Sequence, residues 1–337
     1  MATALSRRAA ELHRAALICD TTLPWTDYGS QERRAETLPR MAAGGVDFVS
    51  LTLASDAESL NALVNKIGRE RREILSCPEQ YRLVESVEDI RAAKAAGQLA
   101  VNFNLQGTNA LEGNIDLVEV FYQLGVRQML MAYNKKNRVG DGCHERTDAG
   151  LSLFGQELVA EMNRVGMLVD CSHTGYRTSM EVMEQSAAPV IFSHSNPRAL
   201  WDHDRNIRDD QAKASAATGG FVGVVGVGIF MGENDSSTEM LLRQIDYYCA
   251  LIGPEHVGLG LDYVYDVEDM QRYMANVKSP PRGNYEKMTA FFQPEQLLEL
   301  TEALLRDGMK DDEVRGILGE NYLRVAETVW RPRPGEG

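Results

Sequence analysis

GLSLFGQELVAEMNRVGMLVDCSH (residues 150–173) carries one complete helix-to-strand unit. Apolar side chains at helical spacing predict a helix over Phe154–Val165, and Gly166 stands where a left-handed residue commonly ends a helix. The apolar run Met167–His173 follows at once, and such a continuous run is typical of a parallel strand covered on both faces. The stretch therefore predicts a strand that packs between helices and ends on a histidine.

The rest of the chain contains segments of the same two kinds. Eight short apolar runs are found, over Ala16–Asp20, Val46–Leu53, Leu99–Gln106, Gln128–Tyr133, Met167–His173, Pro189–His194, Phe221–Val227 and His256–Asp262. Further helical patterns lie between or after them, over Asp56–Ile74, Ser86–Ala96, Ile115–Leu124, Tyr176–Gln185, Asp209–Ala217, Thr238–Ile252, Pro294–Asp307, Asp311–Leu318 and Glu320–Trp330. Long loops, which in compact domains are usually functional, are predicted over Thr21–Arg40, Asn134–Ser152 and Tyr263–Gln293.

This order of segments determines the expected fold class. Strand followed by helix, about eight times, predicts an α/β fold with a parallel sheet and right-handed crossovers. Eight repeats favour closure into a (β/α)8 TIM barrel of the metal-dependent hydrolase type, and we expect residues 1–337 to form a single domain. The alternative is a doubly wound open sheet, but no GxGxxG pattern follows the first strand.

Composition and net charge indicate which classes of binding partner and which cellular compartment to expect. The chain has 337 residues, 44% of them hydrophobic, and a formal net charge of −14, so we expect neither a nucleic-acid partner nor an anionic membrane. Its five cysteines are scattered and form no CxxC pair, which favours reduced thiols in a cytoplasmic protein. The N-terminal segment lacks an apolar core, so no signal peptide is expected, and no apolar run approaches the roughly 18 residues of a membrane span.

Polar residues end most of the predicted strands, and the active site of a (β/α)8 barrel lies at those carboxyl ends. The first run ends in Asp20 and the third in Gln106. The fourth ends in Tyr133 and Asn134, and the last in Asp262. We therefore expect these five side chains to face one another across one end of the barrel.

Two adjacent strands end in histidine, at His173 and His194. Either histidine alone would more often be a hydrogen-bonded structural residue than a ligand. Two side by side, with Asp262 on the last strand, favour a metal site of catalytic type with room for water. A metal there would lower the pKa of that water to about 7. Two further histidines, His144 and His203, fall in loops and are interpreted as exposed rather than as substrate contacts.

Six segments together resemble the membrane (renal) dipeptidase family, within the amidohydrolase-like barrels. They are LICDTTLPW (17–25), the stretch 150–173, PVIFSHS (189–195), DRNIRDDQ (204–211), HVGLGLDY (256–263) and GENYLRV (319–325). The segments match in order and spacing and cover most of the chain. The resemblance is to a divergent, bacterial-type member.

The resemblance implies roles for four residues. Members of that family hydrolyse dipeptides at a barrel site shared by two zinc ions. His173 and His194 match the two histidines of one zinc, and Asp262 matches the residue that handles the proton of the attacking water. Arg205 matches the arginine that holds the substrate carboxylate, which a guanidinium fork can bind through two hydrogen bonds. The alternative for Arg205 is a surface ion pair with a nearby aspartate (Asp202, Asp204 or Asp209).

Four positions depart from the family pattern. The first strand carries Asp20 and Thr22 where the family has His-x-Asp, the two ligands of the other zinc. Gln106 replaces the bridging glutamate, and Tyr133 replaces a histidine that contacts substrate. Because burying excess positive charge is costly and a neutral amide is a poor zinc bridge, we expect one zinc per chain.

The predicted zinc is held by His173 and His194, with Gln106 or Asp20 as weak further ligands. Two zinc ions remain an alternative in which Asp20 rebuilds the second site. The function expected is hydrolysis of a small amide, dipeptidase-like, with Asp262 as base and with Arg205, Tyr133 and Asn134 binding a small substrate that carries a carboxylate. Alternatives are a single-metal lyase or isomerase, a non-catalytic carboxylate-binding relative, or a barrel without a ligand; a homodimer stays open.

Overall fold

The barrel is formed by parallel strands in sequential order around one axis. The computed structural model describes residues 5–25, 30–275 and 289–331. One sheet runs in the order β1-β2-β4-β5-β6-β7, with β3 paired to β4, and a second sheet joins β8 to β9. The strands are β1 (Cys19–Pro24), β2 (Phe48–Ser55), β3 (Tyr81–Leu83), β4 (Leu99–Gln106), β5 (Val126–Leu130), β6 (Leu168–Asp170), β7 (Val190–Ile191), β8 (Val222–Val224) and β9 (Val257–Leu259).

Two sets of contacts close the ring between these sheets. A parallel bridge pairs Phe192 with Val222, which links β7 to β8. At the other junction the backbone N–H of Asp262 donates to the carbonyl of Thr22 at 3.1 Å, so β9 returns to β1. The prediction of a (β/α)8 barrel is confirmed, and the open-sheet alternative is wrong because the last strand adjoins the first. The short strand β3, beside β4, was not predicted.

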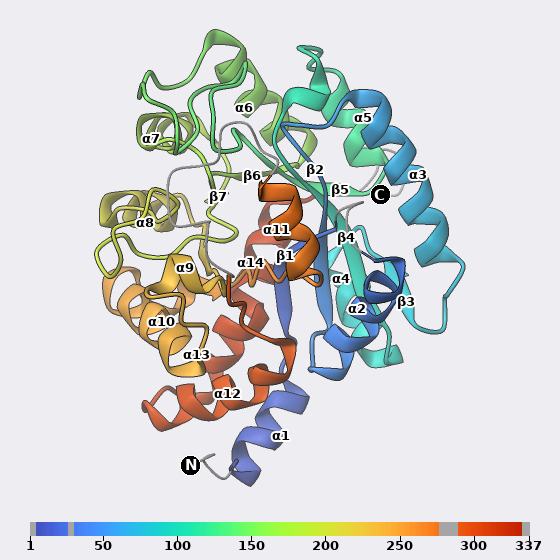
Figure 1. The fold of residues 1–337 in the computed structure, drawn as a ribbon, viewed down its shortest axis with the longest axis vertical. Coiled ribbons are helices and arrows are strands. Elements are labelled where there is room, and N and C mark those ends of the chain that lie inside the picture. Colours follow the sequence, from blue (N-terminus) through green and yellow to red (C-terminus); the bar gives the residue numbers. More distant parts are fainter. Residues whose placement is uncertain (1–4, 26–29, 276–288, 332–337) are drawn as a thin grey trace.

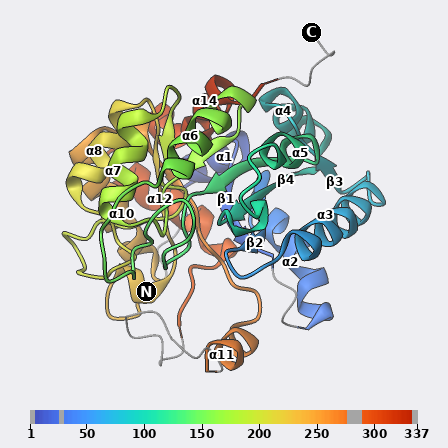
Figure 2. The same cartoon turned by 90° about the horizontal axis from the view of Figure 1, so that it is seen from above.

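Helices surround the strands, with α2, α3 and α4 on one side of the barrel and α7, α8 and α10 on the other (Figures 1 and 2). The longer helices are α1 (Arg7–Ala15), α2 (Gln31–Ala43), α3 (Leu60–Leu75), α4 (Val87–Ala96), α5 (Leu117–Gln123), α6 (Leu153–Val165), α7 (Tyr176–Gln185), α8 (Asp209–Ala217), α10 (Thr238–Ile252), α11 (Val267–Ala275), α12 (Leu297–Arg306) and α14 (Asn321–Val329). Shorter ones are α9 (Gly228–Met231) and α13 (Asp311–Arg315), which continues into a π-helical turn over Gly316–Glu320.

Helix ends agree with the sequence signals where a cap or a glycine marks them. The bounds predicted for α7, α8 and α10 are those observed. Ser86 caps α4 through a reciprocal pair of hydrogen bonds with Asp89, and the left-handed Gly166 ends α6. These signals are local, so they act without help from the tertiary structure.

Two predicted loops contain helices and so were wrong in part. Within Thr21–Arg40, β1 continues to Pro24 and α2 begins at Gln31, capped by Ser30. The sequence of α2 is polar and contains Pro39, so its apolar face is too sparse to register as a helical period. Within Tyr263–Gln293, α11 spans Val267–Ala275, and residues 276–288 lie outside the described part of the chain.

Aromatic side chains close the barrel at the amino ends of its strands. Tyr322, from α14, stacks on Phe48 with ring centroids 5.4 Å apart and meets the edge of Phe221 at 5.7 Å. The main hydrophobic core fills the space between the strands and the surrounding helices. The carboxyl ends of the strands, which finish in polar residues, are therefore the end of the barrel where an active site can form.

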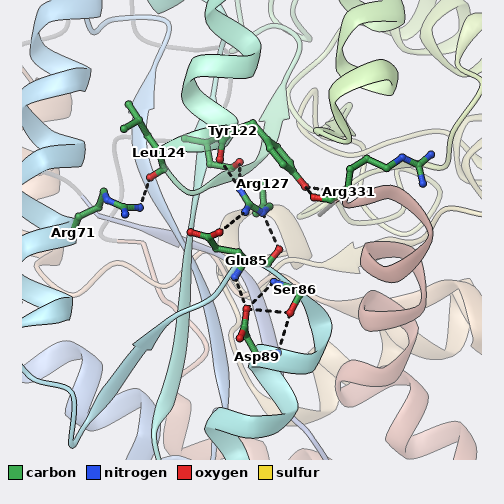
Figure 3. A network of polar contacts seen from close by, with 9 residues as sticks. Arg71, Glu85, Ser86, Asp89, Tyr122, Leu124, Arg127 and Arg331 are labelled. Carbon is green, nitrogen blue, oxygen red and sulfur yellow. Dashed lines mark hydrogen bonds and ion pairs between the residues drawn. The ribbon is translucent and has the colours of Figure 1, made fainter. Parts of the chain in front are cut away.

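A buried arginine links neighbouring segments by hydrogen bonds at the same amino end of the barrel (Figure 3). Arg127, in β5, donates from Nε to the carbonyl of Glu85 at 3.1 Å and from Nη1 to the carbonyl of Tyr122 at 2.7 Å. Its guanidinium also lies over the Tyr122 ring, 4.0 Å from the centroid. The Tyr122 hydroxyl in turn donates to the carbonyl of Arg331 at 2.9 Å, which fastens the end of the described chain.

The helices were also compared with the length and hydropathy of membrane-spanning helices. Among the described residues, none of the helices combines the length and the apolar character that crossing a membrane requires. All five cysteines are free thiols.

Candidate active site

His173 and His194 meet at the carboxyl ends of β6 and β7. Their Nε2 atoms lie 2.9 Å apart, with the ring planes inclined at 60°. Both side chains are buried, at 7% and 0% exposure. The structure therefore brings together the two histidines that the sequence placed on adjacent strands.

The other nitrogen of each ring is held by an acceptor. His173 Nδ1 lies 2.7 Å from the amide oxygen of Asn134, so this nitrogen carries the proton and donates. His194 Nδ1 lies 2.7 Å from Ser193 Oγ, whose own proton is donated to Asp170. With the ring protons on Nδ1, both Nε2 atoms present lone pairs to the space between the rings, as two ligands of one cation would.

This arrangement fits a metal ion. Burial, and next the nearby Arg205, hold the pKa of both imidazoles well below the usual value, so the rings are neutral as metal ligands must be. Imidazole nitrogens bound to one tetrahedral zinc at about 2.0–2.1 Å are themselves about 3.3 Å apart, so the two rings would need to separate by only a few tenths of an ångström. Metal-ligating histidines typically donate from the other ring nitrogen to an oxygen, as both do.

A third strong ligand is not assembled with them. Within the described residues, no three His, Cys, Asp or Glu side chains are grouped as a metal site. The residues present therefore fit one metal held by two imidazoles, with its other positions left for water, substrate or weaker protein donors.

Asp20 and Gln106, the predicted weak ligands, are engaged elsewhere. Asp20 Oδ1 accepts from the backbone N–H of Leu261 at 2.8 Å, and its buried Oδ2 has no hydrogen-bond partner among the described residues. Burial raises the pKa of Asp20 to about 7. Gln106 donates to Thr52 Oγ1 at 3.4 Å. Neither side chain hydrogen-bonds to His173 or His194 in the described part of the chain.

Arg205 is buried beside the backbone of His194, and part of its guanidinium has no hydrogen-bond partner among the described residues. It is 2% exposed, and its Nη2 donates to the carbonyl of His194 at 3.2 Å. Its Nε and Nη1 have no hydrogen-bond partner in the described structure. The predicted alternative, a surface ion pair, is wrong because the side chain is buried; Asp202 and Asp204 pair instead with Arg198. A buried, incompletely paired guanidinium is suited to a carboxylate.

His144 and His203 were interpreted as exposed loop residues, and this is wrong. The side chain of His144 is only 3% exposed and lies 3.6 Å from Asp204, and His203 is 8% exposed. Burial, and next Arg205, lower the pKa of both to about 4. Loop sequence alone did not reveal that the surrounding loops fold over these rings.

Tyr133 and Asn134 both contact His173. The Tyr133 ring stacks on the imidazole with centroids 4.2 Å apart, and Asn134 accepts the hydrogen bond at Nδ1. The carboxylate of Asp56, just beyond β2, joins the segments after β4 and β5. It accepts from the backbone N–H groups of Thr108 at 2.8 Å and Tyr133 at 2.9 Å. Sequence reasoning missed Asp56, because its partners come from two other strand ends.

Three candidate site residues adopt left-handed backbone conformations: Asn134 (φ 62°), His173 (φ 60°) and Asp262 (φ 54°). Such a conformation costs roughly 1–3 kcal/mol for a non-glycine residue and clusters at functional sites. Burial raises the pKa of Asp262 to about 6, while Arg205 acts in the opposite direction. A carboxylate with that pKa is largely ionised at neutral pH and can accept a proton.

Family comparison agrees with this geometry. A model described as membrane dipeptidase (peptidase family M19) matches residues 7–333. The chain belongs to this family. The predicted family resemblance is thereby confirmed.

Individual relatives agree with the assignment. An amidohydrolase from Pseudomonas aeruginosa is 35% identical, with a TM-score of 0.87 over 96% of this chain and 99% of that one. An uncharacterized dipeptidase of Schizosaccharomyces pombe is 29% identical over 78% of this chain. A metallo peptidase from Rhodobacter sphaeroides, liganded with a phosphinate mimic of L-Ala-D-Ala, shares the fold at 19% identity, with a TM-score of 0.76 over 94% of this chain and 99% of that one. The chain spans only 60% to 66% of the length of the curated relatives it matches.

Proposed function

We propose that this membrane dipeptidase family member is a metal-dependent hydrolase of dipeptides or closely related small amides. The observation that carries the proposal is the buried pair of imidazoles, His173 and His194, whose pKa values are held low and whose Nε2 atoms lie 2.9 Å apart. Family membership supports the reaction class. The Rhodobacter sphaeroides neighbour, with its bound L-Ala-D-Ala mimic, supports a dipeptide as the first substrate to test.

The metal proposed is zinc, one ion per chain, held by His173 and His194. A bound zinc ion would acidify a water molecule and polarise the scissile carbonyl. Asp20 and Gln106 are proposed as weak further ligands at most, since the side chain of each is hydrogen-bonded elsewhere. The alternative of two zinc ions would use Asp20 Oδ2, which has no hydrogen-bond partner among the described residues.

The protein side chains supply binding and proton transfer. Arg205, which contacts the His194 carbonyl through Nη2, binds the substrate carboxylate through its Nε and Nη1 donors. Asp262 takes the proton of the attacking water and passes it to the leaving amine. Tyr133 and Asn134 border the substrate where they contact His173, and the phenol can hydrogen-bond the carbonyl oxygen.

An enzyme is favoured over a binding protein because the chain carries Asp262, the carboxylate proposed as base, at the carboxyl end of β9. A pure carboxylate-binding protein needs Arg205 but not a carboxylate whose pKa burial raises to about 6. A lyase or isomerase remains the alternative reaction. A single domain over residues 1–337, a cytoplasmic location and a homodimer stay predictions, as do the lack of nucleic-acid and membrane partners.

The test measures metal content and turnover together. Protein purified without chelator or affinity tag should contain about one zinc per chain and hydrolyse dipeptides such as L-Ala-D-Ala. His194→Ala should retain the fold by circular dichroism but lose the zinc and the activity. A wild-type chain that takes up no metal after reloading, or a His194→Ala variant that keeps it, would contradict the proposal.

A further inference from the structure

Asp170, the last residue of β6, is a buried carboxylate surrounded by hydrogen-bond donors. Its Oδ1 accepts from the backbone N–H groups of Ser172 at 2.9 Å and Ser193 at 3.0 Å. Its Oδ2 accepts from Gln128 Nε2 at 3.1 Å and from the hydroxyl of Ser193. Burial raises the pKa of this carboxyl, but its hydrogen bonds act in the opposite direction. The two backbone N–H groups and the Gln128 amide can only donate, and the Ser193 hydroxyl also donates to this carboxyl, so the ionised form suits the site.

The orientation of the Ser193 hydroxyl follows from this. Ser193 Oγ donates its only proton to Asp170, so the same oxygen can only accept from His194 Nδ1, 2.7 Å away. Thr22 Oγ1 lies farther from that nitrogen, at 3.3 Å. The proton on His194 is thus placed on Nδ1 by a carboxylate that never touches the ring.

The two imidazoles differ in whether their hydrogen-bond partner is itself bound to a charged group. His194 is hydrogen-bonded to the Ser193 hydroxyl, which in turn donates to the anionic Asp170. His173 is hydrogen-bonded to the neutral amide of Asn134. The direct partner of each ring is neutral, so Asp170 acts on the basicity of His194 only through the Ser193 hydroxyl.

We propose that Asp170 and Ser193 are positioning residues: through the chain Asp170–Ser193–His194 they fix the Nδ1–H tautomer of His194 and turn its Nε2 lone pair toward His173. This inference rests on the proposed function, in which those two nitrogens hold the metal. Outer partners of metal-ligating histidines commonly contribute 10–100-fold to metal affinity, so Asp170 and Ser193 are expected to contribute on that scale.

An isosteric variant tests the direction of the hydrogen bonds in the chain Asp170–Ser193–His194, called the relay below. In Asp170→Asn, the two backbone N–H groups at the Oδ1 position require the amide oxygen to take that place. The amide NH2 then faces Ser193 Oγ, which must accept, and the Ser193 proton turns to His194 Nδ1. His194 should switch to the Nε2–H tautomer, which cannot bind a metal through Nε2.

The measurement is the 15N chemical shift of the ring nitrogens in the metal-free protein, followed by titration with Zn2+ alone. In the wild type, His194 should show a protonated Nδ1, and in Asp170→Asn a protonated Nε2 with zinc affinity lowered 10–100-fold. His173 should keep its tautomer in both. Ser195→Ala is the matched control, because the Ser195 hydroxyl is buried one residue past His194 yet has no hydrogen-bond partner in the described structure.

Outcomes for the relay and for the metal site are separable. A folded Asp170→Asn variant whose His194 stays Nδ1–H overturns the relay, whatever its metal content. If Asp170→Asn does not fold, Ser193→Ala replaces it: zinc affinity lowered at least about tenfold relative to Ser195→Ala supports the relay, and equal affinity overturns it. A wild type that binds no zinc contradicts the proposed function instead, and the tautomer measurement still tests the relay.

Discussion

The Nη2 atom of Arg205 donates to the backbone carbonyl of His194 at 3.2 Å, which couples the one buried cation of the described site to one of its two histidines. The same contact leaves Nε and Nη1 unused and keeps the positive charge close to both rings. Its field contributes to the low pKa of His173 and His194. One side chain therefore helps to keep the rings neutral for a metal and offers two N–H donors to a substrate.

Arg205→Ala should weaken binding of substrates that carry a free carboxylate. Loss of a buried, charge-assisted fork corresponds to about 2–4 kcal/mol, so kcat/KM for a dipeptide should fall roughly 30–1,000-fold. The same dipeptide with an amidated carboxyl terminus should lose much less. Arg198→Ala, which removes a partly exposed arginine paired with Asp202, is the control. Equal losses for the acid and the amide would remove Arg205 from carboxylate binding.

The pH dependence of activity should show the ionisation of Asp262. A base must be ionised, and the pKa of Asp262 is raised to about 6, so kcat/KM should fall about tenfold for each pH step below 6 and level off above it. Asp262→Asn should lower kcat roughly 100–10,000-fold across the range. If the residual activity of Asp262→Asn still falls in the same way below pH 6, the ionisation belongs to another group.

Asp246, in α10, should make stability depend on pH. Burial raises its pKa from 3.8 to about 6, so the folded state holds the proton more tightly than the unfolded chain. Its stabilising contribution is therefore complete below pH 4, declines between pH 4 and 6, and is lost above 6. Asp246→Asn should gain about 1–2 kcal/mol over wild type between pH 4 and pH 7, measured by urea unfolding.

Glu327→Gln, at an exposed position of α14, is the control for this trend, because its side chain is solvated in both states. An Asp246→Asn variant whose advantage over wild type is the same at pH 4 and pH 7 would contradict the raised pKa.

Arg127 should contribute to stability and not to catalysis. Its removal leaves the buried carbonyls of Glu85 and Tyr122 without these donors and takes a cation from the Tyr122 ring. Arg127→Ala should lower the free energy of unfolding by about 2–4 kcal/mol. Arg164→Ala removes an arginine with a 59% exposed side chain from ion pairs with Glu119 and Glu161, and should cost far less, because solvated ion pairs contribute little to stability. Similar costs for the two variants would contradict the assigned role of Arg127.

Signals within one segment predicted most of the fold. The strand-and-helix order, the cap at Ser86 and the glycine at Gly166 all act through neighbours a few residues away, so sequence reveals them. The helix α2 was missed because its stability comes from packing onto the barrel rather than from a regular apolar face. For the site, placing His173 and His194 at adjacent strand ends needed only the parallel order of the strands.

The sequence by itself thus determined the barrel, the pair of adjacent histidines and the family pattern around them. Tertiary structure alone decided that Arg205 is buried with unused donors, that His144 and His203 are enclosed, and that Asp170 acts on His194 through Ser193. The repeated Ser-His pair at residues 172–173 and 193–194 was the available signal for this relay. Ring tautomers and desolvation depend on atoms from several strand ends meeting within about 3 Å, and no single segment of sequence specifies that meeting.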